Sequence, residues 1–294
     1  MNEAKNKFSR QILAFGEKGQ DAISRTKIGI VGLGGLGSFI AQMLAYLGIK
    51  EFLLVDDDIT ESTNLNRLIG ATAEDAKNKS PKVDVAQRLI SSIYPQAKVL
   101  KIFKNLCSNE AIDSLAGTPD IIFGCVDNDG ARLVLTELTS AYNKTLIDSG
   151  TEIINNKEFQ EFGGRVIVAR PGDFCLLCAG QIDLADAHEE LESQQERVYR
   201  RQLGYGLGNQ VPAPSVVSLN CIIAGLAVTE FLMLVTGLRE PNRRVTYKGM
   251  RGVFRESLDT KKDDCLVCNS LAGKGEKADI KRYARKGLPK DLPR

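Results

Sequence analysis

The feature that most limits the possible folds of this chain is the glycine-rich segment GLGGLG, residues 32–37. It lies between a short apolar run, 27–32, and a largely apolar stretch, 36–47, which predict a strand followed by a helix. Glycines at such a turn let backbone N–H groups approach phosphates, and the N-terminus of the helix favours negative charge. Asp56 ends the next apolar run, where a carboxylate can bind ribose hydroxyls. The predicted nucleotide-binding residues are Gly32, Gly34, Gly35, Gly37 and Asp56.

Predicted strands alternate with predicted helices through the first half of the chain. The expected strands span 27–32, 51–55, 99–103, 120–125 and 145–148. This alternation predicts an α/β fold with a Rossmann-like, doubly wound and mostly parallel sheet. Ligands of such sheets bind at the carboxyl ends of the strands.

The alternation stops after residue 150. The sequence then predicts a strand at 165–169, a long polar connection at 179–214, a buried apolar helix at 215–235 and a hairpin at 244–248 and 252–256. We therefore divide one continuous domain into a nucleotide-binding half, 1–150, and a second half, 151–270. Residues 271–294 contain eight basic and three acidic residues and predict a solvated basic tail.

Charge and hydropathy argue against several classes of protein. A formal net charge of only +2 argues against a large nucleic-acid-binding surface. The first ten residues contain no apolar segment of a signal peptide. The most apolar stretch, 219–238, is interrupted by Asn220, Thr229 and Glu230, so we expect a buried helix and no membrane span. The expected location is the cytoplasm.

Two C-x-x-C pairs indicate a metal site. Cys175 and Cys178 form the first pair, and Cys265 and Cys268 form the second. Four thiolates from two tight turns suit tetrahedral zinc, which is favoured over disulfides in a reducing compartment. Because four sulfur ligands leave no open position, the zinc would be structural and would tie distant parts of the chain together.

Further polar residues follow the predicted strands at the same edge of the sheet. Asn64 and Arg67 follow the second strand, Lys82 opens the next helix, and Asp127 and Asn128 follow the fourth strand. A reaction on a triphosphate develops charge that such cations stabilise, whereas hydride transfer has little use for them. A carboxylate at position 127 can hold Mg²⁺. The chain has no Walker A sequence, which argues against a P-loop ATPase.

Together these motifs resemble the ThiF/MoeB/HesA family of ubiquitin-activating-type adenylating enzymes. The resemblance extends from about residue 8 to residue 268. The matching segments are Ser9-Arg10-Gln11, GLGGLG, VDDD at 55–58, NLNR at 64–67, SPK at 80–82, CVDN at 125–128 and both C-x-x-C pairs.

The resemblance implies ATP-dependent adenylation of the C-terminal glycine of a ubiquitin-like or sulfur-carrier protein, with release of pyrophosphate. The implied cofactors are ATP, Mg²⁺ and a structural Zn²⁺, and the second half of the chain would bind the carrier protein. Asn64, Arg67 and Lys82 would contact phosphates, Asp56 would hold the ribose, and Asp127 would hold Mg²⁺.

Two further assignments also come from the resemblance. Asn105 falls where family members contact adenine, with Asn128 nearby. Arg10 matches an arginine that reaches the partner's ATP in related homodimers. The resemblance therefore implies a homodimer with composite sites.

The sequence departs from relatives that form a thioester. These carry a cysteine between the first C-x-x-C pair and the apolar helix, whereas residues 179–220 contain none. The simplest expectation is adenylation without a stable thioester, as in the MoeB-like branch. Cys221 and Cys107 remain candidate thiols, with Cys221 expected to be buried in its helix and Cys107 near an exposed junction.

Two alternatives stay open. One is a full activating enzyme that passes the carrier through its own cysteine to a conjugating enzyme. The other is an enzyme similar to the dehydratase that acts on threonylcarbamoyl-adenosine in tRNA.

Overall fold

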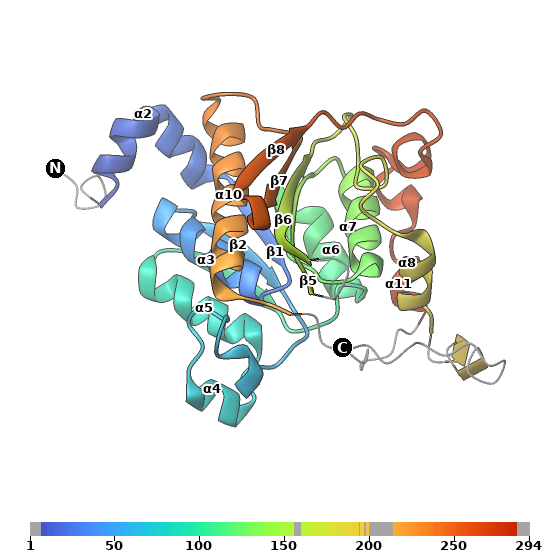
Figure 1. The fold of residues 1–294 in the computed structure, drawn as a ribbon, viewed down its shortest axis with the longest axis horizontal. Helices are drawn as coiled ribbons and strands as arrows, with labels where there is room; N and C mark the ends of the chain where they lie inside the picture. The colour runs from blue at the N-terminus through green and yellow to red at the C-terminus, as the bar shows by residue number, and fades with distance from the viewer. Residues whose placement is uncertain (1–6, 156–159, 194, 197, 200–213, 287–294) are drawn as a thin grey trace.

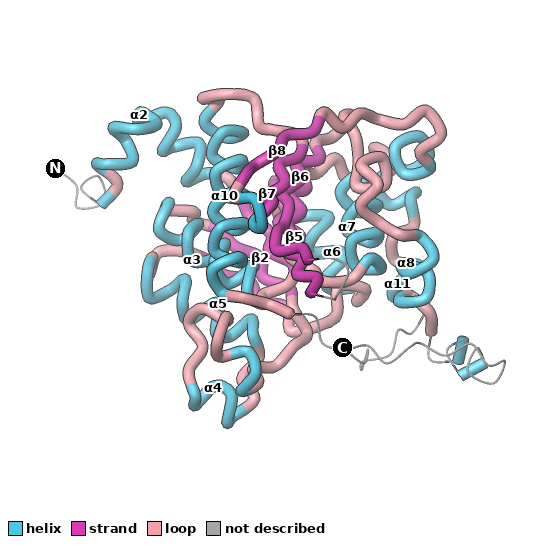
Figure 2. Tube along the Cα trace, in the orientation of Figure 1, coloured by secondary structure: helices cyan, strands magenta, loops and turns pink. Residues whose placement is uncertain are grey.

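The computed structural model describes residues 7–155, 160–193, 195–196, 198–199 and 214–286. Within them, eight strands form one sheet in the order β3-β2-β1-β4-β5-β6-β7-β8. Helices lie on both faces of this sheet (Figures 1 and 2). The strands are β1 (Lys27–Val31), β2 (Glu51–Val55), β3 (Lys98–Ile102), β4 (Ile121–Gly124), β5 (Thr145–Asn155), β6 (Gln160–Ala169), β7 (Arg244–Lys248) and β8 (Val253–Ser257). The helices are α2 (Ser9–Arg25), α3 (Gly35–Leu47), α4 (Ala73–Asn78), α5 (Lys82–Ile93), α6 (Asn109–Gly117), α7 (Asp129–Ala141), α8 (Leu184–Glu190), α10 (Val217–Thr236) and α11 (Arg282–Arg285), with short turns η1 (Ser62–Asn64), η2 (Gly249–Arg251), η3 (Val267–Leu271) and η4 (Gly275–Ala278).

The first five strands form the predicted doubly wound sheet. β1 pairs in parallel with β2 and β4, β2 pairs with β3, and β4 pairs with β5. Two hydrophobic clusters cover the two faces. One includes residues of α2, α3, α5 and α10, and the other includes residues of α6, α7 and the C-terminal segment. Successive strand residues such as Leu53 and Leu54 belong to opposite clusters, because side chains alternate across a strand.

The second half of the sheet is antiparallel. β5 and β6 pair in register from Leu146 with Ala169 to Asn155 with Gln160. Both strands are longer than the predicted segments, 145–148 and 165–169, because this pairing continues well past the core. β6 pairs with β7, and β7 pairs with β8, which confirms the predicted hairpin.

The apolar helix α10 lies in the core. Among the described residues it is the one helix long and apolar enough to cross a bilayer. It packs against β5, β6, α3 and α2. Glu230 within it is 1% exposed, and its carboxylate accepts hydrogen bonds from both terminal nitrogens of Arg239, at 3.0 and 2.7 Å. These contacts are those of a core helix, as the sequence predicted.

The described part of the basic segment, 271–286, packs on the fold and is not the predicted solvated tail. Ala278, Ile280 and Tyr283 are buried in the cluster that contains α7. The Tyr283 hydroxyl donates to Glu137 Oε2 at 2.8 Å, and Arg282 bonds to the same carboxylate. The prediction of a solvated tail rested on the high charge of the segment and gave no weight to its three buried side chains. Residues 287–294 lie outside the described part.

Candidate active site and metal centre

The glycine-rich segment joins β1 to α3, as predicted. Gly34 is the N-cap residue of α3, so no side chain caps the first N–H groups of this helix. Three glycines of this segment are needed for close packing inside the protein. Gly32 has a φ of 85° and lies against the backbone of Cys125, just after β4. Gly37 lies against the Gly32 carbonyl, and Gly35 lies against the side-chain amide of Asn220. A Cβ at Gly34 would meet no described atom within 4 Å. The space beside Gly34, at the N-terminus of α3, can therefore accept a phosphate.

Asp56 follows β2 and holds this segment in place. Its Oδ2 accepts the Leu33 N–H at 2.5 Å, and its Oδ1 accepts the Asp58 N–H at 2.7 Å. The residue is 9% exposed. Its place beside the glycine-rich segment is the one that the sequence predicted, and its contact with a ribose stays a prediction.

The next two aspartates hold two more of the predicted residues. Lys82, the first residue of α5, is 7% exposed, and its Nζ lies 2.7 Å from Asp58 Oδ2. Asn105 Nδ2 donates to Asp57 Oδ2 at 3.1 Å. The structure thus brings Lys82 and Asn105 to the edge where Asp56 lies. Sequence reasoning gave Asp57 and Asp58 no role, although the run of three aspartates was visible.

Asn64 and Arg67 lie on the loop that contains η1. Asn64 Oδ1 accepts the Glu61 N–H at 3.0 Å, so its side chain caps the turn. Arg67 Nη1 donates to the Thr63 carbonyl at 2.6 Å. The Ile69 N–H donates to Ser38 Oγ at 3.1 Å, which fastens this loop to the first turn of α3. The loop that carries both residues is therefore attached to the first turn of α3 through Ile69, and the phosphate contacts of Asn64 and Arg67 stay predictions.

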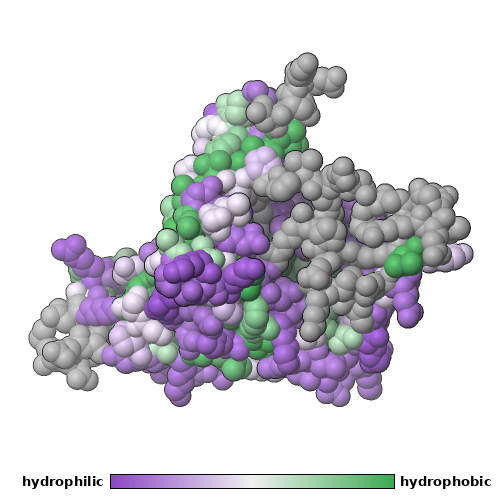
Figure 3. Space-filling model, turned by 90° about the horizontal axis from the view of Figure 1, so that it is seen from below, coloured by the Kyte–Doolittle hydropathy of each residue, from purple (hydrophilic) through white to green (hydrophobic). Residues whose placement is uncertain are grey.

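Asp127 and Asn128 follow β4 at the start of α7. Asn128 is the N-cap residue, and its Oδ1 accepts the Ala131 N–H at 2.7 Å. Asp127 is exposed, and within the described part of the chain its carboxylate accepts one hydrogen bond, from Asn128 Nδ2 at 3.4 Å. An exposed carboxylate that forms no ion pair with a described residue fits a hard cation such as Mg²⁺. Figure 3 shows the molecule from below, where hydrophilic side chains cover much of the described surface beside a hydrophobic band.

Arg10 lies at the opposite edge of the sheet. Its neighbour Gln11 donates to the Tyr46 carbonyl at 3.0 Å, in the last turn of α3. Because α3 begins at the glycine-rich segment and rises about 1.5 Å per residue, its last turn is roughly 16 Å away. Figure 1 shows α2 at the end of the molecule opposite α4. Within one chain the structure does not bring Arg10 to the other predicted site residues.

The two candidate thiols differ from expectation. Cys107 is buried, and burial, with the charge of Asp57, raises its pKa to about 12. Cys221 is exposed, although an apolar helix predicted a buried cysteine. It lies on a turn of α10 whose other side faces the core, where Asn220 is buried. Part of the connection in which a thioester cysteine was expected, 200–213, lies outside the described residues.

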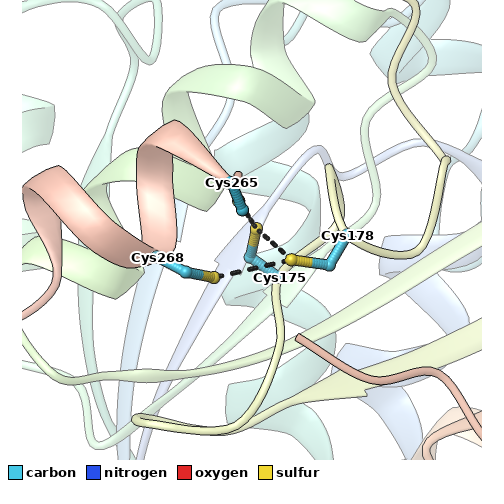
Figure 4. Close-up of side chains that lie close together, drawn as sticks. All are labelled: Cys175, Cys178, Cys265 and Cys268. Atoms are coloured by element: carbon cyan, nitrogen blue, oxygen red, sulfur yellow. Dashed lines mark hydrogen bonds between the residues drawn. The ribbon is translucent and has the colours of Figure 1, made fainter. Parts of the chain in front are cut away.

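The four cysteines of the C-x-x-C pairs meet, as predicted (Figure 4). Cys175 and Cys178 lie on the loop after β6, while Cys265 precedes η3 and Cys268 lies within it. The sulfur of Cys175 is 3.8 Å from Cys178 and 3.5 Å from Cys265, and Cys178 is 3.7 Å from Cys268. Four sulfurs around tetrahedral Zn²⁺, with Zn–S bonds of about 2.3 Å, would be about 3.8 Å apart. The cluster therefore fits zinc.

The protein environment favours a thiolate at one cysteine of the cluster, whereas burial raises the pKa of Cys175 and of Cys268. Burial opposes ionisation of Cys178, but the Lys262 N–H, 3.3 Å from its sulfur, helps to lower its pKa overall. A backbone N–H that points at a sulfur in this way stabilises negative charge on it.

Comparison with protein families gives one match along most of the chain. The model of the ThiF family matches residues 8–267. Ubiquitin-like modifier-activating enzyme 5 of Aedes aegypti is 28% identical over 200 residues, which are 64% of this chain and 48% of that protein. The sulfur carrier protein ThiS adenylyltransferase of Escherichia coli K12 is 30% identical over 167 residues, which are 56% of this chain and 62% of that protein.

Solved structures share the fold. The crystal structure of E. coli MccB with ATP superposes with a TM-score of 0.69 and 20% identity, over 90% of this chain and 74% of that one. PaaA superposes with a TM-score of 0.64 and 19% identity. Likeness at this level of identity concerns the fold alone.

Proposed function

This chain belongs to the ThiF family, and from that premise we propose that it adenylates the C-terminal carboxylate of a ubiquitin-like or sulfur-carrier protein. ATP would be consumed and pyrophosphate released. The names of two relatives, a ubiquitin-like modifier-activating enzyme and a ThiS adenylyltransferase, support this class of substrate. The chain spans about half the length of the first relative, so the carrier protein is part of the proposal.

The observation that most supports the proposal is the gathering of polar groups around the glycine-rich segment. Asp56 bonds to the segment itself, and Lys82 and Asn105 are held by the two aspartates that follow it. Asp127 follows the carboxyl end of the neighbouring strand β4, at the same edge of the sheet as the glycine-rich segment. An ATP molecule with its phosphates beside Gly34 would lie among all of these groups.

These residues suit an attack by a carboxylate on a triphosphate. A carboxylate oxygen would attack the α-phosphorus, the bond to the α,β-bridging oxygen would break, and pyrophosphate would leave with the bonding electrons. Lys82 and Arg67 would neutralise part of the charge that meets there. Mg²⁺ held by Asp127 would supply further positive charge. No general base is needed, because a terminal carboxylate is already ionised at pH 7.

A second copy of the chain would complete the site. Arg10 lies one α3 length from the glycine-rich segment of its own chain, which supports a role at an ATP bound to a partner subunit. We therefore include a homodimer in the proposal. Mixing an Arg10→Ala variant with a Lys82→Ala variant tests it, because mixed dimers would regain one intact site. Failure of the mixture to regain activity above either variant would refute shared sites.

The four-cysteine cluster would hold a structural Zn²⁺. Its sulfur spacings and its two pairs of thiols support this assignment. Metal analysis of the purified protein tests it. About one equivalent of zinc is expected, and no zinc in a protein that remains folded would refute the assignment.

The central experiment is ATP–pyrophosphate exchange, with ubiquitin-like proteins that end in glycine. Wild-type protein should exchange only with such a carrier, and Asp127→Ala should lose exchange. Asp113→Ala is the matched control, because this carboxylate is exposed on α6 and pairs with Lys281 at 2.7 Å, away from the site. No exchange with any carrier despite ATP binding would refute the proposal, and tRNA-dependent activity without a carrier would favour the tRNA-modifying alternative.

One observation favours a second candidate, an enzyme that forms a thioester. Cys221 is exposed, and its neighbour Asn220 packs on Gly35 of the glycine-rich segment. The Cys221 thiolate would attack the carbonyl of the acyl-adenylate, and AMP would leave. A covalent adduct between carrier and enzyme on non-reducing gels, lost on reduction and in Cys221→Ser, would support this candidate. It would also support a conjugating enzyme as the next acceptor of the carrier. Absence of the adduct in an enzyme active in exchange would refute it.

A further inference from the structure

The peptide group that precedes Asp127 is held by a side chain from α7. Arg132 Nη2 donates to the Val126 carbonyl at 3.0 Å. Asp127 itself is exposed, and among the described residues its carboxylate makes only a long contact with Asn128. The position of its carboxylate therefore depends on the backbone on its two sides. Asn128 caps α7 on one side, and Arg132 holds the carbonyl on the other.

Arg132 in turn belongs to a group of charges in which Asp148 is buried and Arg132 and Asp129 are half-buried. Its Nη1 lies 2.8 Å from Asp129 Oδ1, and its Nε lies 3.9 Å from Asp148 Oδ1. Asp148 is 0% exposed, and its Oδ2 lies 3.1 Å from Arg165 Nη1. The two arginines and two aspartates balance in charge. Such a group holds its members in place, since removing one partner leaves an unpaired buried charge.

The backbone leaves room for this arrangement at one glycine. A Cβ at Gly150, at the carboxyl edge on β5, would lie 2.6 Å from Arg165 Nη1 and 3.6 Å from Arg132 Nη2. Any larger residue there would displace the guanidinium of Arg165, which pairs with Asp148. The group of charges around Arg132 therefore depends on β5, which carries Asp148 and Gly150, as well as on β4, which precedes Asp127.

We propose that Arg132 is a positioning residue that sets the place of Asp127 for metal binding, with the hydrogen bond to Asp129 fixing the Arg132 guanidinium and the charge of Asp148 adding a longer-range attraction. The inference rests on the proposed function, which assigns the metal to Asp127. The planar guanidinium of Arg132 donates to the Val126 carbonyl and to the Asp129 carboxylate at once, while its distance of 3.9 Å from Asp148 is that of an ion pair without a hydrogen bond. A lysine ammonium has no such fork, so Arg132→Lys would keep the charge and lose the geometry.

The test measures metal binding without the carrier protein. Mn²⁺ would be titrated into the zinc-loaded protein with ATP and followed by electron paramagnetic resonance. In Arg132→Lys the dissociation constant for Mn²⁺ should rise about tenfold. This is the lower end of the range of affinity losses seen when a group that orients a metal ligand is removed. ATP binding without a divalent cation should stay within about twofold, because Arg132 acts through Asp127. Arg88→Met, which removes an arginine on α5 that pairs with Asp75, should leave both values unchanged.

A second variant separates positioning from folding. Arg132→Met with Asp129→Asn removes one charge of each sign, and the new amide oxygen can still accept the Asp183 N–H that Asp129 accepts at 2.8 Å. This variant should fold and should also bind Mn²⁺ about tenfold more weakly. Unchanged Mn²⁺ affinity in both variants would overturn the inference, and so would unchanged affinity in Asp127→Asn. The proposed function is tested separately by carrier-dependent exchange in wild-type protein.

Discussion

At the scale of single residues, the ion pair between Lys82 and Asp58 is the most consequential contact near the glycine-rich segment. Both side chains are largely buried, at 9% and 14% exposure. Asp58→Asn would leave a buried ammonium without its counter-charge and should lower the free energy of unfolding by about 2 kcal/mol. Denaturant titration of the zinc-loaded protein measures this loss. Asp57→Asn is the control, because its partner Asn105 is neutral, and equal losses in the two variants would contradict the argument.

The cysteines provide a second prediction at this scale. Burial raises the pKa of Cys107 to about 12, whereas Cys221 is exposed. Iodoacetamide reacts with thiolates, so at pH 8 it should label Cys221 and spare Cys107 in the folded protein. Peptide mass spectrometry identifies the labelled site. Cys221→Ser should remove the fast phase of iodoacetamide labelling. Labelling of Cys107 as fast as that of Cys221 would contradict the prediction, because it would show that solvent reaches Cys107 in the folded protein.

At the scale of elements, α4 is joined to α5 through one carboxylate. Asp75 Oδ2 accepts the Thr72 N–H at 2.8 Å, while Arg88 of α5 donates to both carboxylate oxygens, at 2.9 and 2.6 Å. The hydrogen bonds from Arg88 hold the pKa of Asp75 well below its usual range, against the opposing effect of burial.

The sign of the pH effect follows from this shift. A carboxyl whose pKa is lower in the folded protein adds stability above its unfolded pKa of about 3.9, and this is lost as pH falls further. Asp75→Asn should therefore destabilise the protein at pH 6, and its deficit against wild type should shrink below about pH 4. Denaturant midpoints at several pH values measure the difference. A deficit that stays constant with pH would contradict the assignment to Asp75.

At the scale of the whole molecule, the cysteine cluster joins the loop after β6 to the segment that packs on α7. Removal of zinc, or Cys265→Ser, should release this segment, because four thiol groups do not replace metal bonds. The thermal midpoint should fall by roughly 10 °C. Trypsin should then cut within 261–286, while ATP still protects the parallel half. Cys221→Ser is the matched control, and resistance of 261–286 to trypsin without zinc would contradict the prediction.

Local patterns were sufficient for much of this fold. The glycine-rich turn, the strands β1 to β4 and the cysteine pairs each have a signal within a few residues. The positions of Asp56, Lys82, Asn105 and Asp127 at one edge followed as well, because parallel strands end on the same side of a sheet. The meeting of the four cysteines followed from their two C-x-x-C pairs, which are typical of a single zinc site.

The tertiary structure decided the rest. Which cysteine is exposed, how far β5 and β6 pair, and whether 271–286 packs on α7 depend on surfaces distant in sequence. The partners of Lys82 and Arg132 are likewise set by where β2, β4 and β5 end. Sequence alone determined which residues reach the edge of the sheet, since periodicity and turn chemistry are local. Burial and charge pairing arise only when separate elements meet, and they determined how those residues are held.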